Sequence, residues 1–337
     1  MTSSISLINK KEQRFRSLAL LTVIAIYLVI LAGGIVRGTG SGMGCPDWPK
    51  CFGRWVPPTE ISQLPANYQE IYGAKLKGEI EFNATKTWIE YANRLVGVLS
   101  GFFVFATLLS SITYLRKDKA IFWGSLVAFL LIGVNGWLGS RVVATELAHY
   151  MVTIHMLLAL VVVFALLFIL VRSNVGRLQI DSPKSSSLSW LLFTALIVTL
   201  GQIILGTQVR DALDEVVKRL GYSQQDNWIG SLDWRFYVHR SFSLALLIFH
   251  VIVVYQLRKT VKGGLVSTLT TALIAVITIE IVSGIIMAYW GVPAFAQPVH
   301  LELATILIGL QFSMWLLVTP ALIVSGHKSE RSRLVEA

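Results

Sequence analysis

The chain of 337 residues is 54% hydrophobic and only 14% charged, which leaves too little polar surface to cover a soluble globule of this size. A net charge of +10 would suit a nucleic-acid binder, but the basic residues gather at the ends of apolar runs instead. Composition therefore argues against a soluble enzyme and a nucleic-acid partner, and predicts an all-α integral membrane protein embedded in a lipid bilayer.

Apolar runs long enough to cross a bilayer core, about 20 residues each, predict eight transmembrane helices. These span residues 17–36, 88–115, 121–142, 151–171, 189–209, 235–256, 267–290 and 300–324. The first run is too long for a secretory signal and lacks a small-residue cleavage site. Basic clusters precede the first run and follow every second one, so the positive-inside rule predicts that both termini are cytoplasmic.

The first outer loop, residues 38–87, contains both cysteines, Cys45 and Cys51, in GCPDWPKC. On the oxidising side of a membrane, two cysteines six positions apart indicate a disulfide. A reactive or metal-binding pair is the alternative, but two thiols without a nearby histidine make a poor metal site.

The second run begins with three polar residues, Glu90, Asn93 and Arg94, whose spacing puts them on one helical face. Ionisable groups in hydrocarbon are costly, so such a face indicates a functional site. Thr87, three residues before Glu90, offers the alternative that Glu90 only completes a capping box.

The third run ends with Arg141 at its outer mouth, after three glycines that we expect to allow close helix packing, Gly133, Gly136 and Gly139. In the next run His155 lies about one turn inside. His149 lies in the preceding turn and is expected to be solvated or to start the helix.

Residues 173–187 form a polar cytoplasmic linker between an N-terminal half, residues 1–172, and a C-terminal half, residues 188–337, that repeats the first. The corresponding pairs are Arg37 with Arg210, Asn93-Arg94 with His239-Arg240, and His155 with His300. We therefore expect a duplicated four-helix unit, which forms two pseudo-symmetric bundles.

Two histidines of the second half, His239 and His300, start helices that run in the same direction from the outer face. Inward histidines at similar depth on two helices of a bundle suit the two faces of a haem iron. Zinc or copper would need further ligands, and the only nearby carboxylate, Glu302, faces away. His250 lies deeper without a partner histidine, so we interpret it as structural.

Arginines at the outer mouth suit the haem propionates. We expect Arg210 and Arg240 to serve the second half, and Arg37, Arg94 and Arg141 the first.

The first half keeps His155 but has Asn93 in place of a second histidine, and it adds Glu90 where the second half has Phe236. One ligand plus a carboxylate suits a place where a haem is bound, altered and released. Glu90 would act there as a base toward water, or would stabilise positive charge on a porphyrin substituent.

These residues together resemble the heme A synthases over nearly the whole chain. The resemblance rests on the eight runs in two halves, the outer loop GGIVRGTGSGMGCPDWPKC, the helix start EYANRLVG, and the histidines of the fourth, sixth and eighth runs. It implies an oxidoreductase of the bacterial cytoplasmic membrane that converts the C8 methyl of haem O to the formyl of haem A through hydroxylated intermediates, with oxygen from water.

The resemblance also implies a role for each site residue. His239 and His300 would hold a permanent haem b, the first half would receive haem O, and Glu90 would be the essential carboxylate. The cysteine pair would be the family's outer-loop disulfide. The implied partners are a haem O synthase and a membrane electron acceptor such as a quinone, and a homo-oligomer stays open.

One residue departs from the family, because many members have histidine where this chain has Asn93. The substrate iron would then be bound by His155 alone, or by His155 with water or Asn93. Two other classes of function stay open as well: a transmembrane di-haem electron-transfer cytochrome, and a haem-binding chaperone or transporter.

Overall fold

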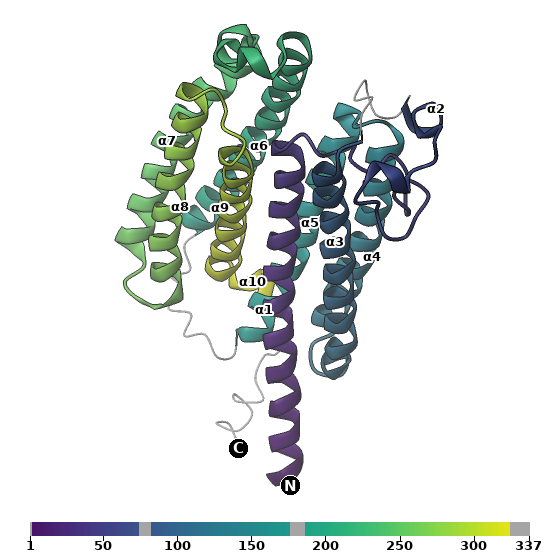
Figure 1. Cartoon of the computed structure of the whole chain (residues 1–337). Coiled ribbons are helices and arrows are strands. Elements are labelled where there is room, and N and C mark those ends of the chain that lie inside the picture. Colours follow the sequence, from purple (N-terminus) through teal and green to yellow (C-terminus); the bar gives the residue numbers. More distant parts are fainter. Residues whose placement is uncertain (1, 74–81, 176–185, 324–337) are drawn as a thin grey trace, which may run out of the picture.

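The computed structural model describes residues 2–73, 82–175 and 186–323, and within this part of the chain it contains eight long helices and no strand (Figure 1). They are α1 Thr2–Gly38, α3 Ala84–Ser111, α4 Lys119–Ala144, α5 His149–Asn174, α6 Ser186–Leu220, α7 Trp234–Thr260, α8 Gly264–Tyr289 and α9 Ala296–Val318. All eight predicted spans are confirmed, and each helix is long and apolar enough to cross a bilayer. The protein is a multi-pass membrane protein.

Short helices occupy the connections. The outer loop carries η1 Ile61–Gln63 and α2 Tyr68–Tyr72, η3 Ile112–Tyr114 follows α3, and η4 Tyr222–Asn227 and η5 Ile229–Ser231 lie between α6 and α7. The final short helix, α10 Pro320–Ile323, follows α9.

Several helix ends differ from the prediction: α1 starts at Thr2 instead of 17, and two further differences have a local cause. The eighth helix ends at Val318 instead of continuing to 324, because Thr319 precedes Pro320 and takes a non-helical backbone conformation. The fifth continues beyond 209 to Leu220, where Gly221 with φ of 72° ends it. The extension is amphipathic and buries Ala212, Leu213 and Val216 against Trp228, Leu232, Phe236 and Val292.

The helices pack in two groups of four (Figure 1). In the first group α1 packs on α3, α3 on α4 and α4 on α5. In the second, α6 packs on α7, α7 on α8 and α8 on α9. Between the groups α9 contacts α1 and α5. The division into two repeated halves stays a prediction, and residues 176–185 of the predicted linker lie outside the described residues.

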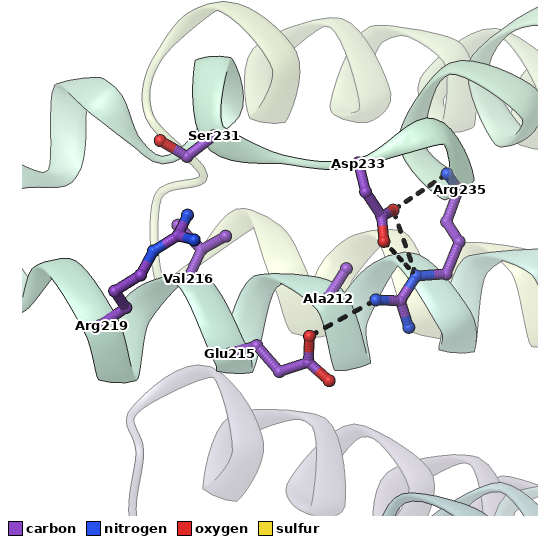
Figure 2. A pocket seen from close by; sticks show the side chains of 7 residues that line it. All are labelled: Ala212, Glu215, Val216, Arg219, Ser231, Asp233 and Arg235. Carbon is purple, nitrogen blue, oxygen red and sulfur yellow. Dashed lines mark hydrogen bonds and ion pairs between the residues drawn. The ribbon is translucent and has the colours of Figure 1, made fainter.

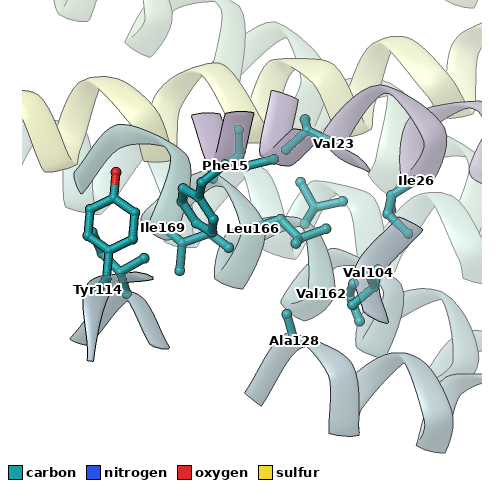
Figure 3. Close-up of a cluster of buried hydrophobic side chains, with 13 residues drawn as sticks. Phe15, Val23, Ile26, Val104, Tyr114, Ala128, Val162, Leu166 and Ile169 are labelled. Atoms are coloured by element: carbon teal, nitrogen blue, oxygen red, sulfur yellow. The ribbon is translucent and has the colours of Figure 1, made fainter. Parts of the chain in front are cut away.

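Each group has its own apolar core. Figure 3 shows the core of the first group, where Phe15, Val23 and Ile26 of α1 meet Leu166 and Ile169 of α5. A second cluster joins α6, α7, α8 and α9, and a smaller one between the groups contains Leu160, Leu196, Ile203 and Ile308. Only 11% of the most apolar stretch of α8 is buried, so its apolar side chains point outward toward lipid.

Candidate functional site

His239 of α7 and His300 of α9 lie close together in an edge-to-face arrangement, with their ring centroids 6.5 Å apart and their planes at 78°. With metal–nitrogen bonds of about 2 Å, two imidazoles on opposite faces of one iron have centroids roughly 6 Å apart. The two predicted ligands are therefore brought together at a separation that fits an axial pair on one haem iron.

Glycines on neighbouring helices make room for both rings. A Cβ added to Gly206 of α6 would lie 3.3 Å from Cε1 of His239, and one added to Gly284 of α8 would lie 3.5 Å from Cε1 of His300. Larger side chains at these positions would enter the space of the rings. The residues present thus fit a porphyrin held between α7 and α9.

Two residues of α8 that the sequence analysis missed contact the ring of His300. Ser283 Oγ lies 2.8 Å from Nδ1 of His300, and Glu280 Oε1 lies 3.2 Å from the same nitrogen. A carboxylate in the middle of an apolar run such as ITIEIVSG is a signal that could have found Glu280. Contact with a ligand histidine could not be read from the sequence.

The first half repeats the glycine cradle around different residues. A Cβ on Gly139 of α4 would lie 3.5 Å from Cε1 of His155, and one on Gly33 of α1 would lie 4.0 Å from Oδ1 of Asn93. His155 Nδ1 and Asn93 Oδ1 are buried without a hydrogen-bond partner among the described residues. Buried polar atoms of this kind suit a chamber that receives a ligand.

The glycines of α4 do not pack as expected. No atom lies within 4 Å of a Cβ built on Gly133 or Gly136, whereas Gly139 faces His155. The prediction of close helix packing through all three is therefore wrong, and only Gly139 makes a close approach to a neighbouring element.

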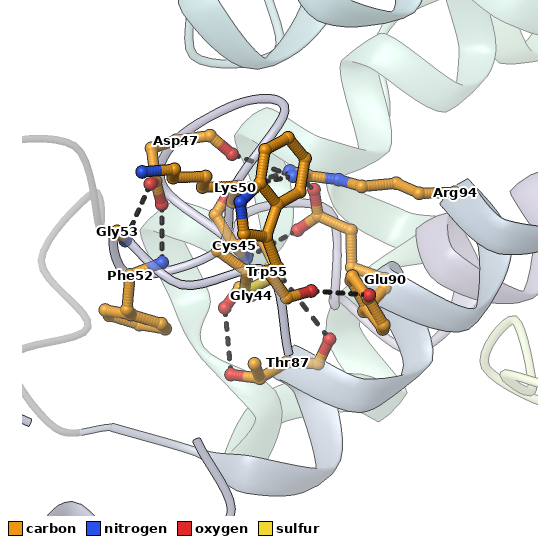
Figure 4. Close-up of a disulfide and its surroundings, with 12 residues drawn as sticks. Gly44, Cys45, Asp47, Lys50, Phe52, Gly53, Trp55, Thr87, Glu90 and Arg94 are labelled. Atoms are coloured by element: carbon orange, nitrogen blue, oxygen red, sulfur yellow. Dashed lines mark hydrogen bonds and ion pairs between the residues drawn. A yellow bond between two sulfur atoms is a disulfide. The ribbon is translucent and has the colours of Figure 1, made fainter. Parts of the chain in front are cut away.

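Glu90 is 4% exposed, and both of its oxygens are engaged (Figure 4). Oε1 accepts a hydrogen bond from Arg94 at 2.5 Å, and Oε2 accepts one from the backbone N–H of Cys45 at 2.7 Å. The capping-box alternative is wrong, because α3 starts at Ala84 with Asn83 as its N-cap. Glu90 therefore binds the outer loop and not its own helix start.

The outer loop is closed by the predicted Cys45–Cys51 disulfide, which is confirmed. Arg94 donates to the carbonyls of Cys45, Asp47 and Lys50 at 2.8–3.0 Å (Figure 4). Thr87 donates to the carbonyl of Gly44 at 2.8 Å. The start of α3 and the disulfide loop thus form one hydrogen-bonded unit, and the contact of Arg94 with a propionate stays a prediction.

Arg37 and Arg210, both expected to face propionates, lie in an ion network at the outer ends of α1 and α6. Arg37 pairs with Asp211 at 2.7 Å and Asp214 at 3.0 Å, and Arg210 pairs with Asp214 at 2.8 Å. Arg210 also donates to the carbonyl of Arg37 at 3.1 Å. The carboxylate partners were missed because the sequence does not show that α1 and α6 meet here.

The remaining predicted arginines are placed differently. Arg240 lies over the rings of Phe236 and Tyr237, 5.6 and 5.5 Å from their centroids. Arg141 is exposed near the end of α4. Arg240 and Arg141 stay candidates for propionate contacts. Among the described contacts, neither arginine bonds one of the three site histidines.

The two other described histidines have protein partners. His149 is the first residue of α5, which confirms the expectation that it starts the helix. Its Nδ1 lies 3.2 Å from Oδ1 of Asp211. His250 is buried, with Nδ1 2.8 Å from the carbonyl of Leu246 and Nε2 2.5 Å from Nε2 of Gln311. These contacts agree with a structural role for His250, whereas His327 lies outside the described residues.

A small pocket lies apart from these histidines, at the outer ends of α6 and α7 (Figure 2). Arg235 bridges Asp233 at 2.8 Å and Glu215 at 3.5 Å on its wall. The hydrogen bond from Arg235 lowers the pKa of the Asp233 carboxyl below its ordinary value. The charged groups on the pocket wall are already ion-paired, so we do not assign the pocket to the candidate site of the three histidines.

Comparison with known proteins gives a consistent picture. A model of the COX15-CtaA family, described as cytochrome oxidase assembly protein, matches residues 16–312. The chain is 26% identical over 341 residues to the heme A synthase of Brucella anthropi, covering 91% of this chain and 94% of that protein. It is 28% identical over 186 residues to the heme A synthase of Shewanella oneidensis, an alignment that spans 55% of this chain and 54% of that relative.

Proposed function

The chain belongs to the COX15-CtaA family of cytochrome oxidase assembly proteins, and from this premise we propose that it is a heme A synthase, an enzyme that acts on haem O. The observation that carries the proposal is the contrast between two similar chambers. One pairs His239 with His300 at a separation suited to one iron, whereas the other offers a single histidine, His155, and Asn93.

In the second half, His239 and His300 would hold a resident haem b. Bound there, haem b supplies one-electron redox chemistry. The cradle formed by Gly206 and Gly284 keeps the neighbouring helices out of the space of the rings. A resident group held by two strong ligands does not exchange readily, which suits a permanent cofactor.

In the first half, His155 would bind the iron of the substrate haem O. Asn93 is a weaker ligand than histidine, so the substrate would be held through one strong bond and can leave after reaction. The outer arginines, Arg37, Arg94 and Arg141, are candidates for orienting its propionates at the aqueous mouth.

The reaction is an oxidation by an oxidoreductase, in which water supplies the oxygen. Each hydroxylation replaces a C–H bond of the methyl by a C–O bond and releases two electrons and two protons. A second hydroxylation followed by loss of water gives the formyl group. The electrons need a membrane acceptor, for which we propose a quinone, and a haem O synthase is the class of enzyme that would supply the substrate.

Glu90 is our candidate for the catalytic carboxylate. Arg94 and the backbone N–H of Cys45 donate hydrogen bonds to its two oxygens, and a carboxylate has lone pairs beyond the two that these donors use. As a carboxylate it can accept a proton from attacking water or stabilise positive charge, and it cannot donate a proton. The disulfide loop fixes its position.

The proposal is tested by incubating purified protein with haem O and following the pyridine haemochrome for a formyl product. We expect conversion by the wild-type protein, strong loss of conversion in Glu90→Gln, and unchanged conversion in Glu70→Gln, an exposed glutamate of the same loop. Haem bound without any formyl product in the wild-type protein would point to a chaperone or an electron carrier instead.

We propose that the protein lies in the bacterial cytoplasmic membrane with both termini cytoplasmic. The distribution of Lys and Arg along the chain supports this orientation. It puts the disulfide loop on the oxidising side.

A further inference from the structure

The ring of His300 is contacted by two residues of α8, Ser283 and Glu280. Ser283 is 5% exposed, and its Oγ makes two hydrogen bonds, one at 2.8 Å with Nδ1 of His300 and one at 2.7 Å to the backbone carbonyl of Glu280. Oε1 of Glu280 lies 3.2 Å from the same ring nitrogen.

These contacts decide which nitrogen of His300 carries the proton. A hydroxyl has one hydrogen, and Ser283 donates it to the carbonyl of Glu280. Its Oγ can then only accept, so the bond with His300 requires a protonated Nδ1 that donates. Nε2 is left with its lone pair, which is the form of imidazole that binds a metal.

The other two site histidines have no such partner from a side chain. Among the described residues, no side chain bonds the buried Nδ1 of His239 or of His155, and their rings lie near the backbone of Gln202 and Asn135 instead. Ser283 directly precedes Gly284, whereas Leu138 directly precedes the corresponding Gly139 and offers no hydroxyl. Among the three site histidines, the hydroxyl is therefore specific to His300.

We propose that Ser283 is a positioning residue for the resident haem, which fixes the tautomer and orientation of His300 so that Nε2 faces the iron. This rests on the proposed function. A ligand histidine that donates its second N–H is a more basic ligand, and a more basic ligand favours the ferric over the ferrous iron. Ser283 thus lowers the midpoint potential of the haem in the second half and helps to distinguish it from the substrate chamber.

The experiment measures the midpoint potential and the low-spin EPR signal of the resident haem in purified full-length protein. Ser283→Ala removes the hydroxyl acceptor at 2.8 Å and leaves Glu280 Oε1 at 3.2 Å, whereas Ser283→Thr retains a hydroxyl. Thr278→Ala is the matched control, because Thr278 is on the same helix, is exposed, and bonds only the carbonyl of Ile274 by a contact seen here. Glu302→Gln controls for the loss of an intramembrane carboxyl near His300 in sequence.

We expect Ser283→Ala to bind haem with a higher midpoint potential and an altered EPR signal. A tenfold loss in the preference for ferric iron corresponds to about 59 mV for one electron. Ser283→Thr should restore the wild-type values, and both controls should keep them.

Equal potentials and EPR signals in the wild-type protein and Ser283→Ala would overturn the assignment of Ser283 while leaving the proposed function intact. So would an equal shift in Thr278→Ala or Glu302→Gln. If the wild-type protein holds no low-spin haem at all, the proposed function fails, and the assignment fails with it.

Discussion

At the scale of single residues, each of the three site histidines lies against a glycine of a neighbouring helix. His239 faces Gly206, His300 faces Gly284, and His155 faces Gly139. Each chamber thus depends on a glycine. A larger side chain at that position would fill the space between the helices that the imidazole and a flat ligand must share.

This argument makes a prediction for Gly206→Leu. The added side chain would occupy the place of the His239 ring, so we expect the resident haem to be lost while the protein still inserts in the membrane. Gly201→Leu is the control, because no atom lies within 4 Å of a Cβ at Gly201 on the same helix. The measurement is the amount of haem per chain in the two purified variants. Equal amounts in both would show that Gly206 does not make room for the His239 ring.

The weaker ligand of the first half leads to a second prediction. Asn93→His would give the substrate chamber two histidines, like the second half, and two strong ligands should retain a haem that normally leaves. We expect a rise in haem per chain and in low-spin character, with slower release of product. Asn93→Ala, which removes the amide without adding an imidazole, serves as control and should not raise the retained haem. No gain in retained haem would show that Asn93 does not face the iron.

At the scale of elements, charged side chains connect the outer ends of α1, α5 and α6. Asp211 is 3% exposed and accepts from Arg37, with His149 at 3.2 Å. The network links the first helix of one half to the first helix of the other. It is expected to fix the distance between the two chambers, since salt bridges of this depth are less screened than surface pairs.

We therefore predict that Asp211→Asn lowers the stability of the protein by about 1–2 kcal/mol, because the substitution removes the charge but keeps one acceptor. Thermal unfolding in detergent should show a lower Tm. Asp226→Asn, in an exposed position between α6 and α7, should leave the Tm unchanged. If Asp211→Asn unfolds at the same Tm as Asp226→Asn and the wild-type protein, the network does not hold the two groups of helices together.

At the scale of the whole molecule, some features could be predicted from the sequence because a single physical constraint fixes them. Bilayer thickness sets the length of an apolar run, so the eight helices were predictable. The oxidising side and the close spacing predicted the Cys45–Cys51 disulfide. Histidines in hydrocarbon are rare, which is why His155, His239 and His300 stood out.

Other features depend on which helices meet, and the sequence does not state that. The partners of Arg37 and Glu90 come from segments far away in the chain. The extension of α6 to Leu220 was missed because a search for apolar runs does not detect an amphipathic helix outside the membrane. The same limit hid Ser283, a small hydroxyl within an apolar run.

The central claim is that α7 and α9 hold one permanent haem and that the first half holds a substrate. The most direct measurement is low-spin haem per chain in washed, purified wild-type protein and in His239→Ala, His300→Ala and His155→Ala. We expect the resident low-spin haem to be present in the wild-type protein and in His155→Ala, and to be lost from His239→Ala and from His300→Ala. A resident low-spin haem that survives both His239→Ala and His300→Ala would contradict the account.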